Sequence, residues 1–442
     1  MRTDACDDNN DRENDDWFLP KDKLVPGIGC RIYLTSKLTN DNGAFLNSRN
    51  KDDSIHVMTE DLVYDVIIVG AGIVGSYTAY HAKRTGKSTL LLEQFPLPHS
   101  RGSSHGQSRT IRSAYGDLEY YTQMMTKAFR MWNELEDQSR QTLFRQTGLL
   151  CIGQKGTKYL DKTTDCLRKN KTPFRRLDYE EFNKAFPMLS YPSEVGGAVV
   201  DYSAGLLLAG RALTAVQNQY LKLGGLLHDG EKMTEIIPGE VIKVKTEARL
   251  YQAKAVVLCV GPWAKKVLTK LGLDVPLQTQ KIKVCYWKEK TPGTFSSRHF
   301  PVFSQLKAIG PHLVYGVPCD EYPDLVKVCL HYGPTVDPDY RDTANDRWVE
   351  DALQKYVKEH IPGLEPYPVI TESCIYTNTP DEDFVLDRHP FYNNIIIGAG
   401  FSGHGFKLAP VVGEILATMA AGKTPEQDMT YFCLNRFKKS HL

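Results

Sequence analysis

The stretch YDVIIVGAGIVGSYTAYHAKRTGKSTLLLEQ, residues 64–94, decides the fold, because it predicts a strand, a glycine-rich turn, a helix and a second strand in succession. The β-branched run at 66–69 is typical of a strand buried on both faces of a parallel sheet. The helix is predicted to end at Gly86, where a left-handed backbone costs little. This order of elements indicates a βαβ unit at the start of an α/β domain.

The turn of this unit carries the spacing G-x-G-x-x-G at Gly70, Gly72 and Gly75. The first glycine permits the tight turn, the second lets a pyrophosphate approach the backbone, and the third lets helix and strand pack closely. We expect phosphate at the helix N-terminus, with Ala71 in the same loop, and a ribose on the carboxylate of Glu93. A plain glycine turn is the alternative, but the complete context favours a bound dinucleotide. The motif does not separate FAD from NAD.

The bulk properties indicate that a ligand is recognised by a local site. The chain has 442 residues, which predicts two domains of roughly 150–250 residues each. Lys plus Arg, 54, nearly balance Asp plus Glu, 53, so neither nucleic acid nor an anionic membrane is an expected partner. No apolar run approaches the ~20 residues of a membrane-spanning helix. The ten cysteines follow no metal-binding spacing, so we expect reduced thiols and no metal.

Residues 1–60 are rich in Asp, Asn, Lys and Ser without periodic apolar positions, and we predict a disordered extension. Farther along, the loop 96–113 concentrates glycine, hydroxyls and cations. Its residues Ser103 and Ser104 are predicted to contact the cofactor, and its cations to meet phosphate, flavin or an acidic substrate. A solvated loop is the alternative for this composition.

Later segments alternate between helix and strand patterns. A helix is predicted at 120–136, a strand at 146–153, charged helices over about 157–186, and an amphipathic helix at 208–223. The apolar strand within 252–263 is predicted to rejoin the first sheet. The runs 278–287, 302–303, 312–315 and 326–332 predict an antiparallel sheet in a second domain.

A second glycine-rich loop, GAGFSGHGFK at 398–407, follows the buried strand 395–397. Two such loops favour a large cofactor with two ends, although this one could also be a simple turn. The cofactor-binding residues predicted here are Gly403, His404, Gly405 and Phe406.

From 64 to 442 the chain resembles the monomeric sarcosine oxidase family, and most closely its eukaryotic peroxisomal branch of sarcosine or L-pipecolate oxidases. The motifs that carry the resemblance are VIIVGAGIVGS at 66–76, SSHGQSRTIR at 103–112, ESCIYTNTPDEDFVLDRHP at 372–390 and GAGFSGHGFKLAP at 398–410. The resemblance implies FAD rather than NAD. It also implies a Rossmann-like FAD-binding domain of the glutathione-reductase type and an α+β second domain with a mixed sheet over the flavin.

On this resemblance we predict domain boundaries. The discontinuous FAD-binding domain comprises 61–146, 207–277 and 380–436, the substrate domain 147–206 and 278–379, and a targeting tail 437–442.

The resemblance also assigns roles to residues that composition alone leaves ordinary. It implies that Cys374 joins the flavin through a thioether, where sequence alone would predict a plain buried thiol. It implies that Arg112 and Lys407 bind the substrate carboxylate, Arg as a planar fork and Lys as a point charge. Surface cations are the alternative for that pair.

Five further residues match the family's flavin and substrate positions. Lys327 matches a lysine that speeds the reaction with oxygen, although on an alternating strand a lysine can also face water. Tyr315 and His331 match residues on the amine side of the substrate, and Arg109 and His105 match residues on the flavin face.

The predicted activity is an FAD-dependent oxidase of secondary-amine amino acids that reduces O2 to H2O2. Among the substrates we prefer L-pipecolate, with sarcosine and L-proline as further candidates. Cys329 and Leu330 depart from the pattern of the bacterial enzymes, so the motifs do not decide among the three. A flavin dehydrogenase with another electron acceptor and a non-catalytic flavin-binding protein are the alternatives. We expect a monomer in the peroxisome, imported through a receptor that binds Ser440, His441 and Leu442.

Overall fold

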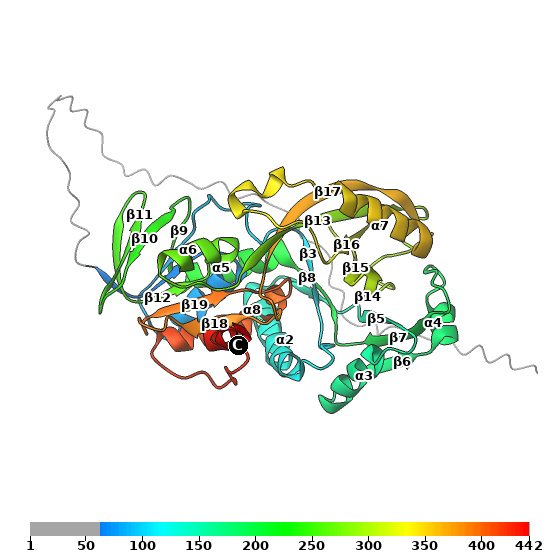
Figure 1. Ribbon diagram of the computed structural model, residues 1–442, viewed down its shortest axis with the longest axis horizontal. Coiled ribbons are helices and arrows are strands. Elements are labelled where there is room, and N and C mark those ends of the chain that lie inside the picture. The colour runs from blue at the N-terminus through cyan, green and yellow to red at the C-terminus, as the bar shows by residue number, and fades with distance from the viewer. Residues whose placement is uncertain (1–61, 442) are drawn as a thin grey trace, which may run out of the picture. The chain divides into compact units, whose positions relative to one another are not determined.

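The computed structural model describes residues 62–441, and side chains from 62 to 437 (Figure 1). The predicted extension, residues 1–60, and the side chains of the predicted import signal, residues 440–442, lie outside the described part.

The chain begins with the predicted βαβ unit. β1 (Val63–Val69) and β2 (Thr89–Leu92) pair in parallel, and α1 (Ile73–Arg84) connects them. Gly86 follows the helix with φ of +81°, as the left-handed helix end requires. All four residues of β2 are buried, which matches a strand covered on both faces.

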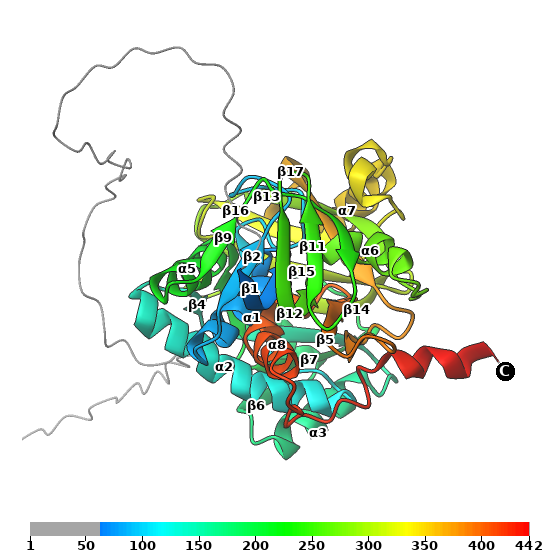
Figure 2. The same cartoon turned by 90° about the vertical axis from the view of Figure 1, so that its left-hand side faces the viewer.

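Eight strands form the first sheet, and five of them are parallel neighbours in the order β19, β12, β1, β2 and β9. The predicted return of the strand within 252–263 to this sheet is confirmed, because β12 pairs with β1 (Figure 2). The strands added to β1 and β2 are β9 (Leu226–His228), β10 (Met233–Ile237), β11 (Ile242–Thr246), β12 (Leu250–Leu258), β18 (Val385–Arg388) and β19 (Ile395–Ala399).

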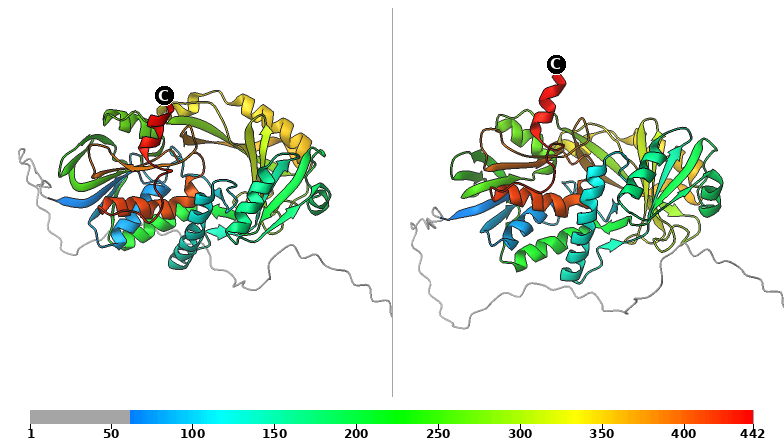
Figure 3. Two further views of the ribbon diagram at one scale, coloured as in Figure 1. Left: turned by 60° about the horizontal axis from the view of Figure 1, so that its bottom comes forward. Right: turned by 90° about the horizontal axis from the view of Figure 1, so that it is seen from below.

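Helices cover this sheet on the side shown in Figure 3, where α2, α5 and α8 lie near one another. They are α2 (Glu119–Ser139), α5 (Ala209–Lys222) and α8 (Gly405–Ala420). α8 approaches α1 so closely that a Cβ on Gly413 would lie 2.6 Å from the Cβ of Tyr77. Trp132 of α2 donates to the carbonyl of Lys407 at 2.8 Å. These contacts hold the second glycine-rich loop above the first.

The second sheet is mixed, because its strands pair antiparallel except at the parallel junction of β14 and β5. Its strands, in spatial order, are β17 (Leu364–Asn378), β13 (Gln278–Glu289), β16 (Leu325–Leu330), β15 (His312–Pro318), β14 (Val302–Ile309), β5 (Leu149–Gln154), β7 (Val195–Asp201) and β6 (Phe174–Leu177). The helices of this region are α3 (Tyr159–Lys169), α4 (Tyr179–Ala185) and α7 (Arg347–His360).

The prediction of helices over all of 157–186 is wrong in its centre, where β6 separates α3 from α4. The sequence FRRL of β6 has no strong period of its own, and its backbone is held by antiparallel pairing with β7. That partner comes from a distant part of the sequence, so a local pattern could not reveal it.

A small sheet carries Arg109. Its strands are β3 (Ser108–Ile111), β8 (Gly205–Leu208) and β4 (Phe144–Arg145). Short helices complete the chain at α6 (Ala264–Lys270), η1 (Gly261–Trp263), η2 (Pro338–Thr343) and η3 (Leu434–His441). Among residues 62–441, no helix combines the length and apolarity needed to cross a membrane.

Candidate active site

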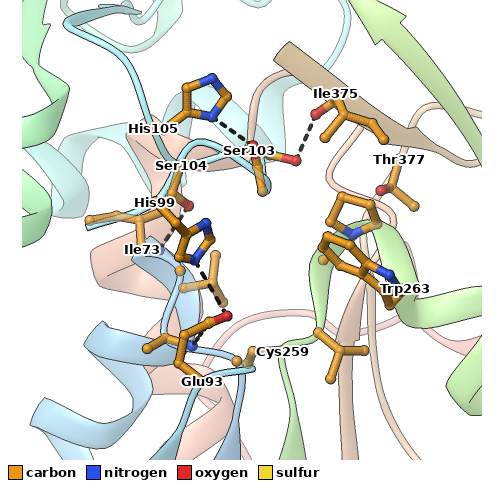
Figure 4. Close-up of a pocket in the computed structure, with 18 of the residues that line it drawn as sticks. Ile73, Glu93, His99, Ser103, Ser104, His105, Cys259, Trp263, Ile375 and Thr377 are labelled. Carbon is orange, nitrogen blue, oxygen red and sulfur yellow. Dashed lines mark hydrogen bonds and ion pairs between the residues drawn. The ribbon is translucent and has the colours of Figure 1, made fainter. Parts of the chain in front are cut away.

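A cavity of about 930 Å³ opens at the carboxyl ends of β1, β2 and β12, where parallel sheets commonly bind cofactors (Figure 4). Both glycine-rich loops line it, through Gly70 and Gly72 from the first and Gly403 and Gly405 from the second. The cavity is large enough for a cofactor. We call it the dinucleotide cavity.

The N-terminus of α1 faces this cavity without a capping side chain or an acidic residue in its first turn. Its Ile73 amide donates to the hydroxyl of Ser104 at 2.9 Å. Gly75 lies inside α1 and lines neither this cavity nor the second, smaller cavity that adjoins it. A Cβ there would lie 1.9 Å from the carbonyl oxygen of Gly70, so this glycine permits close packing of helix and turn. The positive end of the helix is therefore available to an anionic ligand.

Glu93 is buried at the floor of the dinucleotide cavity, where β2 ends. One carboxylate oxygen accepts the amide of Ala71 at 2.9 Å, and the other accepts the amide of Phe95 at 3.1 Å. The same carboxylate lies 3.3 Å from a ring nitrogen of His99 (Figure 4). These contacts fix the position of the carboxylate beside the glycine turn.

The loop after β2 is attached to β17 across the cavity. The Ser103 hydroxyl donates to the carbonyl of Ile375 at 2.6 Å. The two ring nitrogens of His105 lie 2.7 Å from the Gly102 carbonyl and 3.0 Å from the Ser373 carbonyl. Burial and the charge of Arg109 lower the pKa of His105 to about 4, so the ring is neutral at pH 7.

A second cavity of about 380 Å³ adjoins the first, and His105, Arg109, Gly403 and Phe406 line both. We call it the inner chamber. All seven side chains predicted as catalytic line it: His105, Arg109, Arg112, Tyr315, Lys327, His331 and Lys407. Cys374 and His404 line it as well, so the structure brings together residues from five separate segments of the chain.

Arg112 and Lys407 meet at one aromatic ring in this chamber. The guanidinium carbon of Arg112 lies 4.3 Å and the ammonium of Lys407 5.8 Å from the ring centroid of Tyr115. Arg112 also donates to the Ala114 carbonyl, and Lys407 donates to the His404 carbonyl at 3.4 Å. Burial, together with the charges of Arg112 and Arg109, lowers the pKa of Lys407 well below its ordinary value.

Asp201 holds the loop that carries Arg112 and Tyr115. It is fully buried, and its carboxylate accepts the amides of Ser113 at 2.9 Å and Ala114 at 3.1 Å. The position of Arg112 thus depends on the end of β7, in the other sheet.

Lys327 is 4% exposed on β16, so it does not face water. Its ammonium donates to the carbonyl of Ser108 at 3.0 Å, and burial with the charge of Arg109 lowers its pKa. Arg109 donates to the carbonyls of Ser103 at 3.0 Å and Ser108 at 2.8 Å. Both cations therefore donate to the backbone carbonyl of Ser108 at the start of β3, and Arg109 lines both cavities.

His331 and Tyr315 also line the chamber, with ring centroids 6.1 Å apart. The Tyr376 hydroxyl lies 3.3 Å from a ring nitrogen of His331. Burial and the charges of Lys407 and Arg112 lower the pKa of His331 to about 4, so this ring is neutral at pH 7.

Tyr376 and Tyr115 are chamber residues that the sequence reasoning missed. A signal existed for Tyr376, because alternation along a strand puts it on the same face as Cys374, two residues earlier. Tyr115 follows Arg112 in an irregular loop, where no period indicates its direction.

Buried histidines predict a strong acid sensitivity of the fold. Burial lowers the pKa of His81 to about 3, and those of His105 and His331 to about 4, from an ordinary value of 6.5. Between pH 6.5 and 4 the unfolded chain therefore binds more protons than the folded chain, so the free energy of unfolding falls as the pH is lowered. We expect a loss on the order of several kcal/mol, measured as urea midpoints at pH 7 and pH 5.

His81→Gln is the matched variant, since a glutamine amide can still donate to the Pro410 carbonyl that lies 3.1 Å from the His81 ring. The urea midpoint of this variant should fall less between pH 7 and pH 5 than that of the wild type. Equal slopes for the two proteins would contradict the assignment of a neutral His81.

Comparisons with known proteins identify relatives over most of the chain. The family model described as "DAO: FAD dependent oxidoreductase" matches residues 65–419. The peroxisomal sarcosine oxidase of Homo sapiens is 48% identical over 388 residues, which cover 86% of this chain and 98% of that protein. The Mus musculus protein of the same name is 46% identical over 387 residues, with coverage of 86% and 98%.

Among solved structures, NikD, described as "an unusual amino acid oxidase essential for nikkomycin biosynthesis", superposes with a TM-score of 0.74. It is 22% identical, and the match covers 84% of this chain and 97% of NikD. At this identity the likeness confirms the predicted fold, a Rossmann-like domain with a mixed-sheet second domain, and no more.

Proposed function

This chain belongs to the family of FAD-dependent oxidoreductases, and from that membership we propose that it is a peroxisomal sarcosine oxidase. Its substrates are amino acids with a secondary amine, and its electron acceptor is oxygen. L-pipecolate is a second substrate in this proposal, and L-proline a third. The alternative that FAD binds without catalysis is disfavoured by the set of cations retained in the inner chamber.

The observation that carries the proposal is the pair Arg112 and Lys407. Both line the inner chamber against one tyrosine ring, and neither forms an ion pair with a carboxylate among residues 62–437. A buried cation without an anion is costly, and a carboxylate bound from outside removes that cost. An amino-acid substrate supplies that carboxylate and leaves its amine free to point elsewhere in the chamber.

The residues present fit FAD. The dinucleotide cavity has an uncapped helix N-terminus for the pyrophosphate, and a buried carboxylate, Glu93, for the ribose. Beyond it, the junction with the inner chamber is the place for the flavin ring. When bound, FAD would supply the two-electron chemistry: it would take two electrons and one proton from the substrate C–H as a hydride equivalent, the amine N–H would lose the second proton, and O2 with two electrons and two protons would become H2O2.

The chain's own residues position the substrate and stabilise the negative charges of its carboxylate and of the reduced oxygen. Arg112 and Lys407 hold the carboxylate. His331, neutral because of burial, lies on the amine side with Tyr315 and adds no charge that would repel the amine. Lys327 provides a fixed positive charge where oxygen gains its first electron. The imine product then takes up water, and sarcosine yields glycine and formaldehyde.

The experiment that tests this function is oxygen-dependent release of H2O2 from purified holoenzyme with sarcosine, L-pipecolate and L-proline side by side. Release with sarcosine supports the proposal. A higher kcat/KM with L-pipecolate supports the wider substrate range. A yellow protein that releases no peroxide with any of the three would overturn the substrate class.

The covalent attachment of the flavin is a separate proposal, based on Cys374 in the motif shared with the family. Its side chain is 7% exposed, lines the inner chamber, and packs with Ile282 and Cys329. We expect acid-precipitated wild type to remain yellow and Cys374→Ser to lose its flavin to the supernatant. Cys285→Ser is the control, because this buried thiol lines neither cavity. A colourless wild-type precipitate would contradict covalent attachment of the flavin.

We also propose import into peroxisomes through Ser440, His441 and Leu442, and a monomeric enzyme. Deleting these three residues should leave kcat/KM unchanged and return the protein to the cytosol, as seen by fluorescence microscopy of a tagged chain. Peroxisomal location of the truncated chain would contradict the assignment.

A further inference from the structure

A third hollow, of about 330 Å³, lies on the surface next to the inner chamber. Its walls come from the start of α3 and the end of β14, with Asp117 on the rim. It shares two wall residues with the inner chamber, Tyr159 and Leu306. These two side chains therefore stand between the hollow and the chamber.

We propose that this hollow is the entrance through which the amino-acid substrate reaches the inner chamber, with Leu306 as its gate and Lys158 and Lys307 as the groups that first meet the substrate carboxylate. The inference rests on the proposed function, since it concerns the route of an amino-acid substrate. We call this hollow the vestibule.

The backbone at Leu306 departs from regular β-strand pairing. Gln305 of β14 pairs with Val314, and Ile309 pairs with His312, so three residues, 306–308, oppose Leu313 alone. Such a bulge interrupts the hydrogen-bond ladder and re-aims side chains, and bulges are common beside active sites. Leu306 is thus held less rigidly than its neighbours in the sheet and can move aside.

Lys307 is the strained residue of this bulge. Its φ is +56°, a left-handed conformation that a residue with a Cβ adopts at a cost of about 1 kcal/mol or more. This backbone carries the exposed Lys307 side chain on the vestibule wall while Leu306 reaches the wall that both hollows share. Such strain is common at functional sites, and here it fixes the directions of the Leu306 and Lys307 side chains.

The charges of the vestibule suit a carboxylate. Three exposed lysines, Lys158, Lys162 and Lys307, face one acid, Asp117, which pairs with Lys162. Lys158 and Lys307 have no ion-pair partner in the part of the chain whose side chains are described. Two cations therefore remain available to an anion at the mouth.

Arg112 is the next cation on the inner side of this wall. Burial raises the pKa of Tyr159, and the positive charge of nearby Arg112 opposes that change, which places the guanidinium within electrostatic reach of the tyrosine. Cations therefore lie on both sides of the shared wall, Lys158 and Lys307 in the vestibule and Arg112 and Lys407 in the inner chamber.

The test uses holoenzyme and 2-furoate, a ring carboxylate without an amine that cannot be oxidised as a substrate. Rapid mixing, followed by the change in flavin absorbance, gives its association and dissociation rate constants. In Leu306→Trp we expect both rate constants to fall about tenfold, and their ratio, Kd, to change little, because a gate alters the barrier and not the bound state. Leu250→Trp, at an exposed leucine of β12, should behave as wild type.

A second variant tests the charges. Lys158→Glu with Lys307→Glu should lower the association rate constant of 2-furoate several-fold at low salt, about threefold or more, and weaken its dependence on ionic strength. Lys222→Glu with Lys243→Glu, at exposed sites on α5 and β11, is the control with the same change in net charge. Unchanged association in both Leu306→Trp and the lysine variant would overturn the entrance, and so would a raised Kd with an unchanged association rate in Leu306→Trp.

These outcomes are separate from the fate of the proposed function. If wild type binds 2-furoate but oxidises no secondary-amine acid, the function fails while the entrance can still be measured. If wild type oxidises sarcosine and the gate variant keeps both wild-type rate constants, the entrance fails alone.

Discussion

Lys407→Met is expected to lower kcat/KM for sarcosine about 30- to 4,000-fold while the protein keeps its flavin. The reason is that buried Lys407 and half-buried Arg112 meet at the Tyr115 ring, where a bound carboxylate would have both cations as partners. Removing one partner of a buried charge pair costs about 2–5 kcal/mol, because the remaining charge stays desolvated. Steady-state peroxide release and the ratio of flavin to protein absorbance measure the two quantities.

The pH dependence of ligand binding separates carboxylate binding from a structural role. Burial and neighbouring cations lower the pKa of Lys407, and a bound anion would raise it again. Above the lowered pKa, binding must take up a proton, so the Kd of 2-furoate for wild type is expected to rise with pH. Lys407→Met should bind more weakly and lose this dependence, whereas Lys265→Met, at an exposed site on α6, should match wild type. An unchanged Kd in the Lys407 variant would contradict the role.

Lys327→Met is expected to slow reoxidation of the reduced enzyme by O2 about 100- to 1,000-fold and to leave anaerobic reduction by sarcosine almost unchanged. Loss of one preorganised electrostatic group commonly costs this much. Lys327 is buried, lines the inner chamber and is held to the Ser108 carbonyl at 3.0 Å. Stopped-flow absorbance, first without and then with oxygen, resolves the two half-reactions.

Lys327→Arg keeps a positive charge at this place and should recover part of the reoxidation rate. If Lys327→Met is reoxidised by O2 at the wild-type rate, the proposed role of Lys327 in the reaction with oxygen is wrong. Slow reoxidation of wild type itself, with rapid transfer to a quinone, would instead favour a flavin dehydrogenase.

Local patterns were strong enough to predict the elements around the cofactor. A glycine spacing, a β-branched run and a helix end all lie within residues 64–94, so no distant partner is needed to recognise them. The strand within 252–263 was placed in the first sheet because a chain that leaves a sheet commonly returns to it, and its apolar run is typical of a buried strand. β6 was missed because its stability comes from β7 and not from its own four residues.

The sequence by itself determined the dinucleotide-binding unit, the second glycine-rich loop and, through four motifs, the family. Only the tertiary structure decided that Lys327 is buried and that Arg112 meets Lys407 at the ring of Tyr115. It also decided that Tyr376 reaches His331 and that Leu306 separates a surface hollow from the chamber. The physical reason is that a motif records neighbours along the chain, whereas burial, charge pairing and cavity walls depend on neighbours brought by packing from distant strands.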